Sequence, residues 1–541
     1  MAAVAGRLDA HPDERSPRRH GGLAQRFAAV PYHWQALVVI VMGSFMVVLD
    51  TTIVNVALPR MIQVFGADIN QGQLILTGYM VALAVVMPAT GYCSDTFGAK
   101  RTYLWVVGLF TLGSALCGLA PSIEGLVLFR VLQGLGGGMV MPLGMSILFQ
   151  TVPPRERGTV MGVFGLPILV APIIGPSLGG YLVEYVDWRP IFTLNIPVGI
   201  LALFAGAAIL REAPPRGRTR FDWPGFILSA IGFSAAMVAL ERAPVDGWGS
   251  TEVTALLLVA AFVIPCWIIV ELASDEPLLD LSVLGDRTYL VGSLVSFVAM
   301  VAMFSSLFLL PLFLQNVRGL GALDTGLLLM PQGITAALTM PVAGRLLDRF
   351  GPKRVVIPGV LALAFATWLL TGIDVGTTDG TIQLALAIRG VAMGLMMMPA
   401  LTVAMDTIPP HQIARATALS NVLRQVFGAF GTGIFASILL DRQNFHRAAL
   451  SQGITADNVV AIGVQSNATI AALDRGLSEA AAQALGMQAL TNHVKLAAQV
   501  RGFDDCFLLA TFVALTALLP AVWLRRGKRA SASGHGGAAL E

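Results

Sequence analysis

Two ionisable residues, Asp50 and Arg130, lie in stretches that are otherwise apolar or rich in small residues. Asp50, in VVLDTTIVNVALP, follows about fifteen residues without a charged side chain. Burial disfavours the charged form of a carboxyl group, so such a group can exchange a proton near neutral pH. Arg130, in LFRVLQGLGGG, keeps its charge and sets the field that a nearby acid feels. The pair is a candidate for proton binding. The alternatives are a structural carboxylate bonded to Thr51, Thr52 or a neighbouring helix, and an arginine that reaches water at the interface.

Other buried charges and pliable side chains accompany this pair. Arg389 and Arg424 also lie in apolar stretches, and we interpret them mainly as structural charges. Methionine adapts to varied partners, so methionines near Arg130 and Arg389 are candidates to line a substrate cavity, with core filling as an equal alternative. These methionines are Met139, Met393, Met396 and Met397.

Small residues and prolines follow one another in GLPILVAPIIGPSLGGYL, residues 165–182. Small residues allow neighbouring helices to approach closely, and proline removes a backbone hydrogen bond and kinks a helix. The pattern predicts a helix that packs tightly yet bends, which suits a rocking interface; a merely kinked helix is the alternative. The residues concerned are Gly175, Pro176, Gly179 and Gly180.

A charged loop motif occurs twice, as GYCSDTFGAKR at 91–101 and as GRLLDRFGPKR at 344–354. An aspartate placed after one helix can pair with an arginine, or with the N-terminus of a helix in an opposing half, and so hold that side closed. We therefore expect a gate, although a tight turn carrying topogenic charges would have the same pattern. The gate candidates are Asp95, Lys100, Arg101, Asp348 and Arg354.

Composition indicates what positions these residues. Of the 541 residues, 55% are hydrophobic and only 12% are charged, and the mean hydropathy is +0.74. Apolar runs of about 20 residues can cross about 30 Å of hydrocarbon as helices. Fourteen such runs are present, at about 34–57, 71–91, 102–120, 125–147, 158–182, 190–210, 223–240, 252–271, 289–312, 322–343, 355–373, 381–402, 415–440 and 503–524.

The repeated motif indicates two related halves. After each loop copy, an arginine (Arg130, Arg389) and then a Pro-Pro pair recur in the same order. The sequence therefore predicts an all-α polytopic membrane protein with a major facilitator fold, in which two six-helix halves are joined by two inserted helices, giving 14 transmembrane helices. The expected parts are a tail at 1–33, a first bundle at 34–210, a linker with the inserted pair at 211–284, a second bundle at 285–525 and a tail at 526–541.

Charge distribution predicts the orientation. Most of the 35 Lys and Arg fall in segments that lie on one side of the membrane, together with both termini, so the positive-inside rule makes that side cytoplasmic. The segment 441–502 then becomes a long extracytoplasmic loop, too polar to span, which we expect to form short amphipathic helices over the outer mouth. A lid or partner-docking role is weighed there against a passive connector.

Several classes of function find no support. The net charge is only +3, without a basic cluster that would indicate a nucleic-acid partner. The four cysteines lie far apart without metal-ligand spacing, and no phosphate-binding loop or supported nucleophile is visible. We expect no metal, no cofactor and no enzymatic activity.

Five motifs in order resemble those of the fourteen-helix drug:proton antiporters of the EmrB/QacA type, and the resemblance extends from about residue 34 to 525. The motifs are LDTTIVNVALP at 49–59, GYCSDTFGAKR at 91–101, RVLQGLGGG at 130–138, GPSLGG at 175–180 and DWRPIFTLNIPVG at 187–199. Departures from the family pattern are Tyr92, Cys93, Thr96 and Pro190.

The resemblance implies proton-coupled export of toxic amphipathic compounds by alternating access. It assigns coupling to Asp50 and Arg130, the gate to Asp95 and Arg101, and the antiport-associated bend to Gly175 and Pro176. The expected partners are a small amphipathic substrate, protons and the lipid bilayer, with the proton-motive force as the energy source; no sequence feature supports a periplasmic adaptor. The alternative is a major facilitator carrier for one metabolite or lipid, working as a symporter or facilitator.

Overall fold

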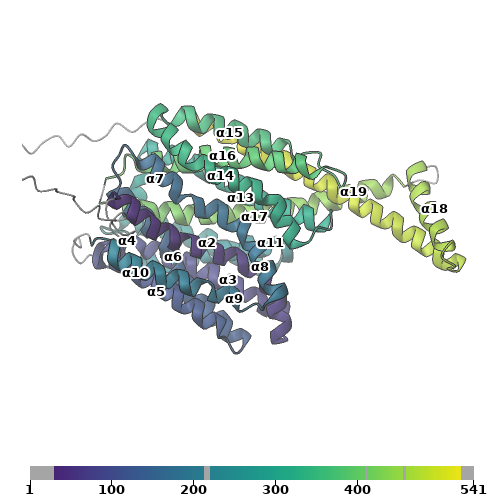
Figure 1. The fold of residues 1–541 in the computed structure, drawn as a ribbon, viewed down its shortest axis with the longest axis horizontal. Coiled ribbons are helices and arrows are strands. Elements are labelled where there is room, and N and C mark those ends of the chain that lie inside the picture. The colour runs from purple at the N-terminus through teal and green to yellow at the C-terminus, as the bar shows by residue number, and fades with distance from the viewer. Residues whose placement is uncertain (1–29, 213–219, 410, 455–457, 525–541) are drawn as a thin grey trace, which may run out of the picture.

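The computed structural model describes residues 30–212, 220–409, 411–454 and 458–524, and every regular element in these ranges is a helix (Figure 1). The helices run side by side in one bundle, and one helical extension projects beyond it. Apolar sequence explains the preference, because a helix satisfies all of its backbone hydrogen bonds internally and can therefore lie in lipid.

The first half of the bundle contains two interrupted passes. The chain continues from α3 through the short turn η1 into α4, where Pro88 lies in the turn, and α7 is followed by α8 after Gly165. The elements of this half are α2 (Tyr32–Phe65), α3 (Ile69–Val86), η1 (Met87–Ala89), α4 (Thr90–Phe97), α5 (Ala99–Gly118), α6 (Ile123–Thr151), α7 (Arg157–Phe164), α8 (Leu166–Tyr185), α9 (Pro190–Thr193) and α10 (Asn195–Ile209).

The second half follows an inserted helix pair. The pair is α11 (Trp223–Asp246) and α12 (Thr251–Ala273), and these two helices pack against each other. The remaining elements are η2 (Leu281–Gly285), α13 (Arg287–Asn316), α14 (Ala322–Phe350), α15 (Pro352–Trp368), α16 (Asp379–Met405), α17 (Ile413–Gln452), α18 (Val459–Leu473), α19 (Glu479–Thr516) and α20 (Leu518–Ala521).

Among the described residues, 12 helical segments are long and apolar enough to cross a membrane, so the chain is a multi-pass membrane protein. The predicted spans 102–120 and 355–373 correspond to α5, with 20 residues, and α15, with 17 residues, which are outside this set. Both nevertheless belong to the bundle: α5 packs against α6 and α10, and α15 packs against α16 and α19.

The segment 441–502 differs from the expectation of short helices over a mouth. Instead, α17 continues without a break for 40 residues and α19 for 38 residues, and only α18, with 15 residues, is a short separate helix. Figure 1 shows α18 and the adjoining part of α19 projecting away from the bundle. The composition of the segment is helix-favouring, and the flanking spans simply extend into it.

The two halves meet along two seams. In one, α7 and α8 of the first half lie against α14 of the second; in the other, η1 and α4 lie against α17. Further along the second seam the inserted helix α11 contacts both α3 and α17, and a Cβ on Gly433 would come within 2.4 Å of the Leu240 carbonyl oxygen. The inserted pair is therefore part of the contact between halves.

Glycines permit the closest approach at the first seam. A Cβ on Gly344 would lie 2.1 Å from the carbonyl oxygen of Gly158, and one on Gly158 would lie 2.5 Å from that of Gly344. Because both obstacles are backbone atoms, no side-chain movement could relieve such a clash. The backbones of α7 and α14 can touch here only because both positions lack a side chain.

We expect Gly344→Ala to separate α7 from α14. Overpacking costs about 1–3 kcal/mol. The ratio of molecules in which α7 and α14 are in contact to molecules in which they are apart should therefore fall roughly tenfold. The measurement is disulfide cross-linking of a cysteine pair introduced across the seam in a cysteine-free background.

Gly108→Ala is the matched control, because a Cβ there would meet only Leu203 Cδ2 at 3.9 Å. Equal cross-linking yields in the two alanine variants would contradict this account of the seam.

Candidate functional site

A buried polar cluster surrounds Asp50 in the first half. Arg130 Nη1 lies 2.6 Å from Asp50 Oδ2, and the two side chains are 1% and 0% exposed. Gln133 Nε2 and Asn195 Nδ2 donate to Asp50 Oδ1 at 2.9 and 3.0 Å. The carboxylate thus accepts from three donors, an arrangement that fits its ionised form.

The cluster draws on four helices. Asp50 comes from α2, Arg130 and Gln133 from α6, and Asn195 from the start of α10, while Ser114 of α5 accepts from both amides at 3.1 and 3.0 Å. Ser114 in turn donates to the Phe192 carbonyl at 2.9 Å. These hydrogen bonds form one connected network around the ion pair, which fixes its position in the interior of the bundle.

The guanidinium of Arg130 is further enclosed. It lies 3.8 Å from the centre of the Tyr79 ring, and its Nη1 also donates to Gln133 Oε1 at 2.8 Å. Sequence reasoning brought Asp50 and Arg130 forward but missed Gln133, Asn195 and Ser114. The available signals were the spacing of three residues between Arg130 and Gln133, which places both on one helix face, and the single asparagine in the apolar stretch TLNIPVG.

The glycines of α8 bring that helix against α2 directly beside Asp50. A Cβ on Gly175 would lie 2.2 Å from Thr52 Oγ1, and one on Gly179 would lie 2.8 Å from Ile53 Cγ1. Pro176 lies inside α8 and Gly180 is half-buried on the same helix. The predicted bend is therefore in contact with the helix that carries the acid.

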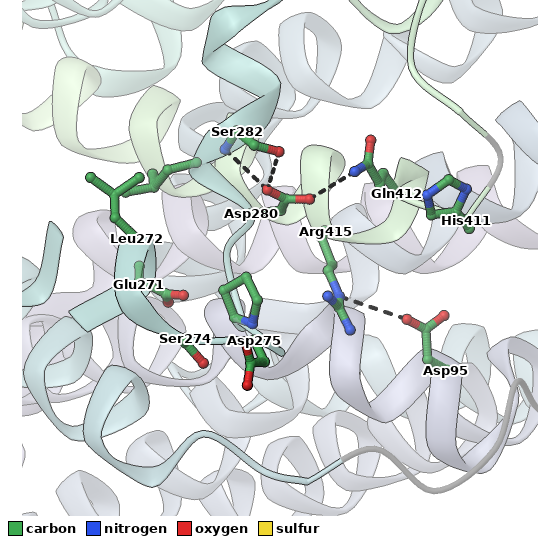
Figure 2. Close-up of a pocket in the computed structure, with 12 residues that line it drawn as sticks. Asp95, Glu271, Leu272, Ser274, Asp275, Asp280, Ser282, His411, Gln412 and Arg415 are labelled. Carbon is green, nitrogen blue, oxygen red and sulfur yellow. Dashed lines mark hydrogen bonds and ion pairs between the residues drawn. The ribbon is translucent and has the colours of Figure 1, made fainter. Parts of the chain in front are cut away.

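Two reciprocal contacts join the halves at the end of the bundle where the loop motifs lie. Asp95 of α4 faces Arg415 in the first turn of α17, with Arg415 Nε 3.9 Å from Asp95 Oδ2 (Figure 2). Asp348 of α14 accepts from Gly158 N at 3.3 Å and from Thr159 Oγ1 at 3.4 Å, at the N-terminus of α7. Each motif aspartate thus contacts the first turn of a helix in the opposite half, where the helix dipole favours an anion.

Additional bonds strengthen the same end. Arg157 lies 3.4 Å from Asp406 across the halves, and Thr417 Oγ1 donates to the Pro142 carbonyl at 3.4 Å. This end of the bundle is closed by contacts between α6 and α7 on one side and the α16–α17 region on the other.

The other gate candidates do not bridge the halves. Lys100 Nζ donates to the Ala207 carbonyl at 2.7 Å, near the end of α10, and Arg101 Nε lies 3.6 Å from Glu212. Both contacts lie within the first half or the segment that directly follows α10. Arg354 is exposed near the start of α15. Lys100 and Arg101 therefore bind groups at and just after the end of α10, whereas Asp95 and Asp348 make contacts between the halves.

A pocket of about 480 Å³ opens beside the Asp95–Arg415 pair. Its acidic lining includes Glu271 at the end of α12 and Asp280 before η2 (Figure 2). Asp280 accepts from Gln412 Nε2 at 3.0 Å, which ties the linker after the inserted pair to the loop before α17.

The remaining candidates are the methionines of α6 and α16 and the buried arginines of α16 and α17. Met139, Met393, Met396 and Met397 are all buried in the main apolar core, which extends across both halves. Arg389 is 0% exposed and Arg424 is 4% exposed. Among the described residues no group of three or more His, Cys, Asp or Glu side chains could hold a metal ion.

Residues 40–432 match the Major Facilitator Superfamily. The chain belongs to this superfamily of membrane transporters. Its members move small molecules across membranes and are not enzymes, which agrees with the expectation from sequence. The two halves, the seams and the closed end described above are thus parts of a transporter.

Individual relatives support this assignment. The transporter is 34% identical over 499 residues to the multidrug resistance protein B homolog of Mycobacterium tuberculosis, covering 90% of this chain and 89% of that protein. It is 31% identical over 502 residues to the multidrug export protein EmrB of Escherichia coli, covering 92% and 96%. The crystal structure of the human organic anion transporter MFSD10 covers 92% of this chain and 100% of that one with a TM-score of 0.58; at 15% identity this likeness shows the fold alone.

A double-mutant cycle should reveal the strength of the buried ion pair. Breaking a buried pair by removing one partner costs about 3–5 kcal/mol, because the other charge stays buried. We expect Asp50→Asn and Arg130→Gln each to lower the thermal unfolding midpoint in detergent. The double variant should lose less than the two single losses added together; additive losses would show that the pair contributes nothing as a unit.

Asp348→Asn should loosen the closed end without affecting the rest of α14. A capping carboxylate contributes about 0.5–2 kcal/mol, so maleimide labelling of a cysteine introduced at the buried Thr417 should become severalfold faster. Asp324→Asn is the control, because Asp324 is exposed in the first turn of the same helix, at its opposite end. Unchanged labelling in Asp348→Asn would exclude a gating contact.

Proposed function

We propose that the transporter is a proton-coupled antiporter that exports amphipathic drugs or other toxic small molecules across the cytoplasmic membrane by alternating access. The observation that carries the proposal is the Asp50–Arg130 pair, an acid and a permanent cation buried together within the membrane-spanning part. Ionisable groups are expensive there and are retained where they move ions or protons. The homology to multidrug exporters points in the same direction.

The surroundings of Asp50 support a role in proton exchange. While Arg130, Gln133 and Asn195 all donate hydrogen bonds to the carboxylate, they stabilise its ionised form and oppose protonation. Loss of the Arg130 contact would leave a buried, uncompensated carboxylate, which lowers its charge by binding a proton. A movement of α2 against α6 would therefore couple conformation to protonation, with Arg130 as the competing cation.

The glycine contacts of α8 give a route for that movement. Thr52 and Ile53 follow Asp50 directly and pack on Gly175 and Gly179. A change in the bend of α8 at Pro176 would shift the segment of α2 that holds the acid. In this proposal Gly175, Pro176, Gly179 and Gly180 form the bend of the antiporter, and the opening and closing of the seams between the halves changes the access of the substrate.

We assign the end closed by Asp95 and Asp348 to the cytoplasmic side, together with both termini, because the Lys-Arg pairs of the motifs lie there. With α5 and α15 counted as spans, fourteen helices cross the membrane: two six-helix halves and the inserted pair α11–α12. The extension of α17, α18 and α19 is then extracytoplasmic. We assign the binding of amphipathic substrates to the buried methionines of α6 and α16, because their side chains adapt to different shapes.

The deciding experiment uses purified protein in proteoliposomes with an imposed pH gradient and a fluorescent amphipathic dye. Asp50→Asn removes the proton-binding group, so gradient-driven dye movement should fall by at least about tenfold, the effect expected when an essential charge is lost. Dye binding, measured without a gradient, should persist.

Glu124→Gln is the control, since Glu124 is exposed in the first turn of α6, the helix that carries Arg130. Gradient-driven export that survives in Asp50→Asn would remove the proton role from this residue. Parent protein that moves dye at a rate independent of the pH gradient would indicate a facilitator instead.

A further inference from the structure

Arg389 of α16 is a buried cation whose charge the described protein does not neutralise. Its side chain is 0% exposed, and Nη2 donates to the Ala302 carbonyl of α13 at 2.7 Å. Its Nε and Nη1 have no hydrogen-bond partner among the residues that the structure describes. Within the described ranges no carboxylate lies close enough to offset the charge of this guanidinium, which is surrounded by the protein interior.

Arg389 can be aligned with a residue of the first half through the glycines that follow each position. A Cβ on Gly134 of α6 would meet the Tyr79 carbonyl oxygen, and a Cβ on Gly390 of α16 would meet the Gln332 carbonyl oxygen, at 2.7 and 2.2 Å. Gly390 therefore corresponds to Gly134. Arg389, the preceding residue, occupies the position of Gln133, about one turn further along the helix than the position of Arg130.

The helices that face them align in the same way. Asp50 lies nine residues before Pro59 in α2, and Ala302 lies nine residues before Pro311 in α13. Gln133 bonds to Asp50 in the first half, and Arg389 bonds to Ala302 in the second. The second half therefore has an arginine in place of the amide and an alanine in place of the acid.

An independent pair of contacts gives the same register. Gly144 packs on Ile40 in the first half, and Gly292 packs on the Ala400 carbonyl in the second. Ile40 and Gly292 each lie nineteen residues before the helix proline, and Gly144 and Ala400 each lie ten residues after the aligned glycine. In this register Leu386 occupies the position of Arg130.

We propose that the second half contains an anion site centred on Arg389, which takes a small monovalent anion in the place that the Asp50 carboxylate fills in the first half. The chemistry is that of a buried guanidinium with two nitrogens, Nε and Nη1, whose N–H groups find no partner among the described residues, and with a positive charge that no described carboxylate offsets. Ala302 has no carboxylate and Leu386 carries no charge, so in this register neither residue supplies an acid or a competing cation beside the Arg389 guanidinium.

A water molecule could accept hydrogen bonds at Arg389 but would leave the charge unneutralised, whereas an anion does both. Arg424 differs, because its Nη2 donates to Asn421 Oδ1 of the same helix, which leaves Nε as its one fully buried nitrogen without a partner among the described residues. The anion could be an inorganic halide or the carboxylate of a small organic acid. The inference does not depend on the proposed export function.

The test measures thermal unfolding of the purified full chain at constant ionic strength, with gluconate, which is too large for an interior site, as the reference anion. Replacing gluconate by chloride or bromide should raise the midpoint by about 2–4 °C if the halide binds the folded state. An acetate arm distinguishes the sources: stabilisation by acetate but not by halide would assign the site to a carboxylate. No shift with any of these anions would overturn the proposal.

Two substitutions localise the effect. Ala302→Asp supplies an internal carboxylate, so the variant should be as stable in gluconate as the parent is in chloride and should no longer respond to the anion. Ala302→Asn, of equal size but uncharged, should not gain stability in gluconate. Arg389→Gln should also lose the response.

A response to anions that persists in both Ala302→Asp and Arg389→Gln would place the bound anion elsewhere and overturn the proposal. Should a variant fail to fold, the parent protein still gives an answer. Bromide, located by anomalous scattering in crystals, is expected beside the Arg389 guanidinium, and its absence from that position would overturn the proposal as well.

Discussion

The ion pair between Asp50 and Arg130 is the interaction on which the first half depends. It joins α2 to α6 inside the protein, and its supporting amides and hydroxyl bring in α5 and α10. Neither charge could remain there alone, because an isolated charge in a low-dielectric interior is strongly disfavoured. The positions of four helices are therefore tied to one polar cluster. A rearrangement of that cluster would move α2, and α8 packs on the turn of α2 that follows Asp50.

Much of this arrangement could be predicted from the sequence. Hydropathy located the helices, since a run of twenty apolar residues has few alternatives to a membrane helix. The repeated motif indicated two halves, and isolated charges in apolar runs brought Asp50 and Arg130 forward. These signals can be read along the chain without knowing which helices are in contact.

The rest depends on which helices meet. Gln133 and Asn195 are ordinary amides until α6 and α10 are placed around Asp50. The sequence could not show that Lys100 serves the end of α10 while Asp348 reaches α7, because both assignments require the contacts between helices. The long continuation of α17 and α19 was missed for a different reason: a polar helix has no hydropathy signal, and helix propensity alone is a weak indicator.

The extension formed by α17, α18 and α19 has a mechanical consequence. At about 1.5 Å per residue, a helix of 40 residues such as α17 is about 60 Å long, roughly twice the thickness of the hydrocarbon core. Because α17 and α19 continue unbroken from the second half, the extension is a rigid arm, or lever, that turns together with that half. A small tilt of the bundle becomes a large displacement at α18, and anything that restrained the lever at its tip would resist the tilt with the same mechanical advantage.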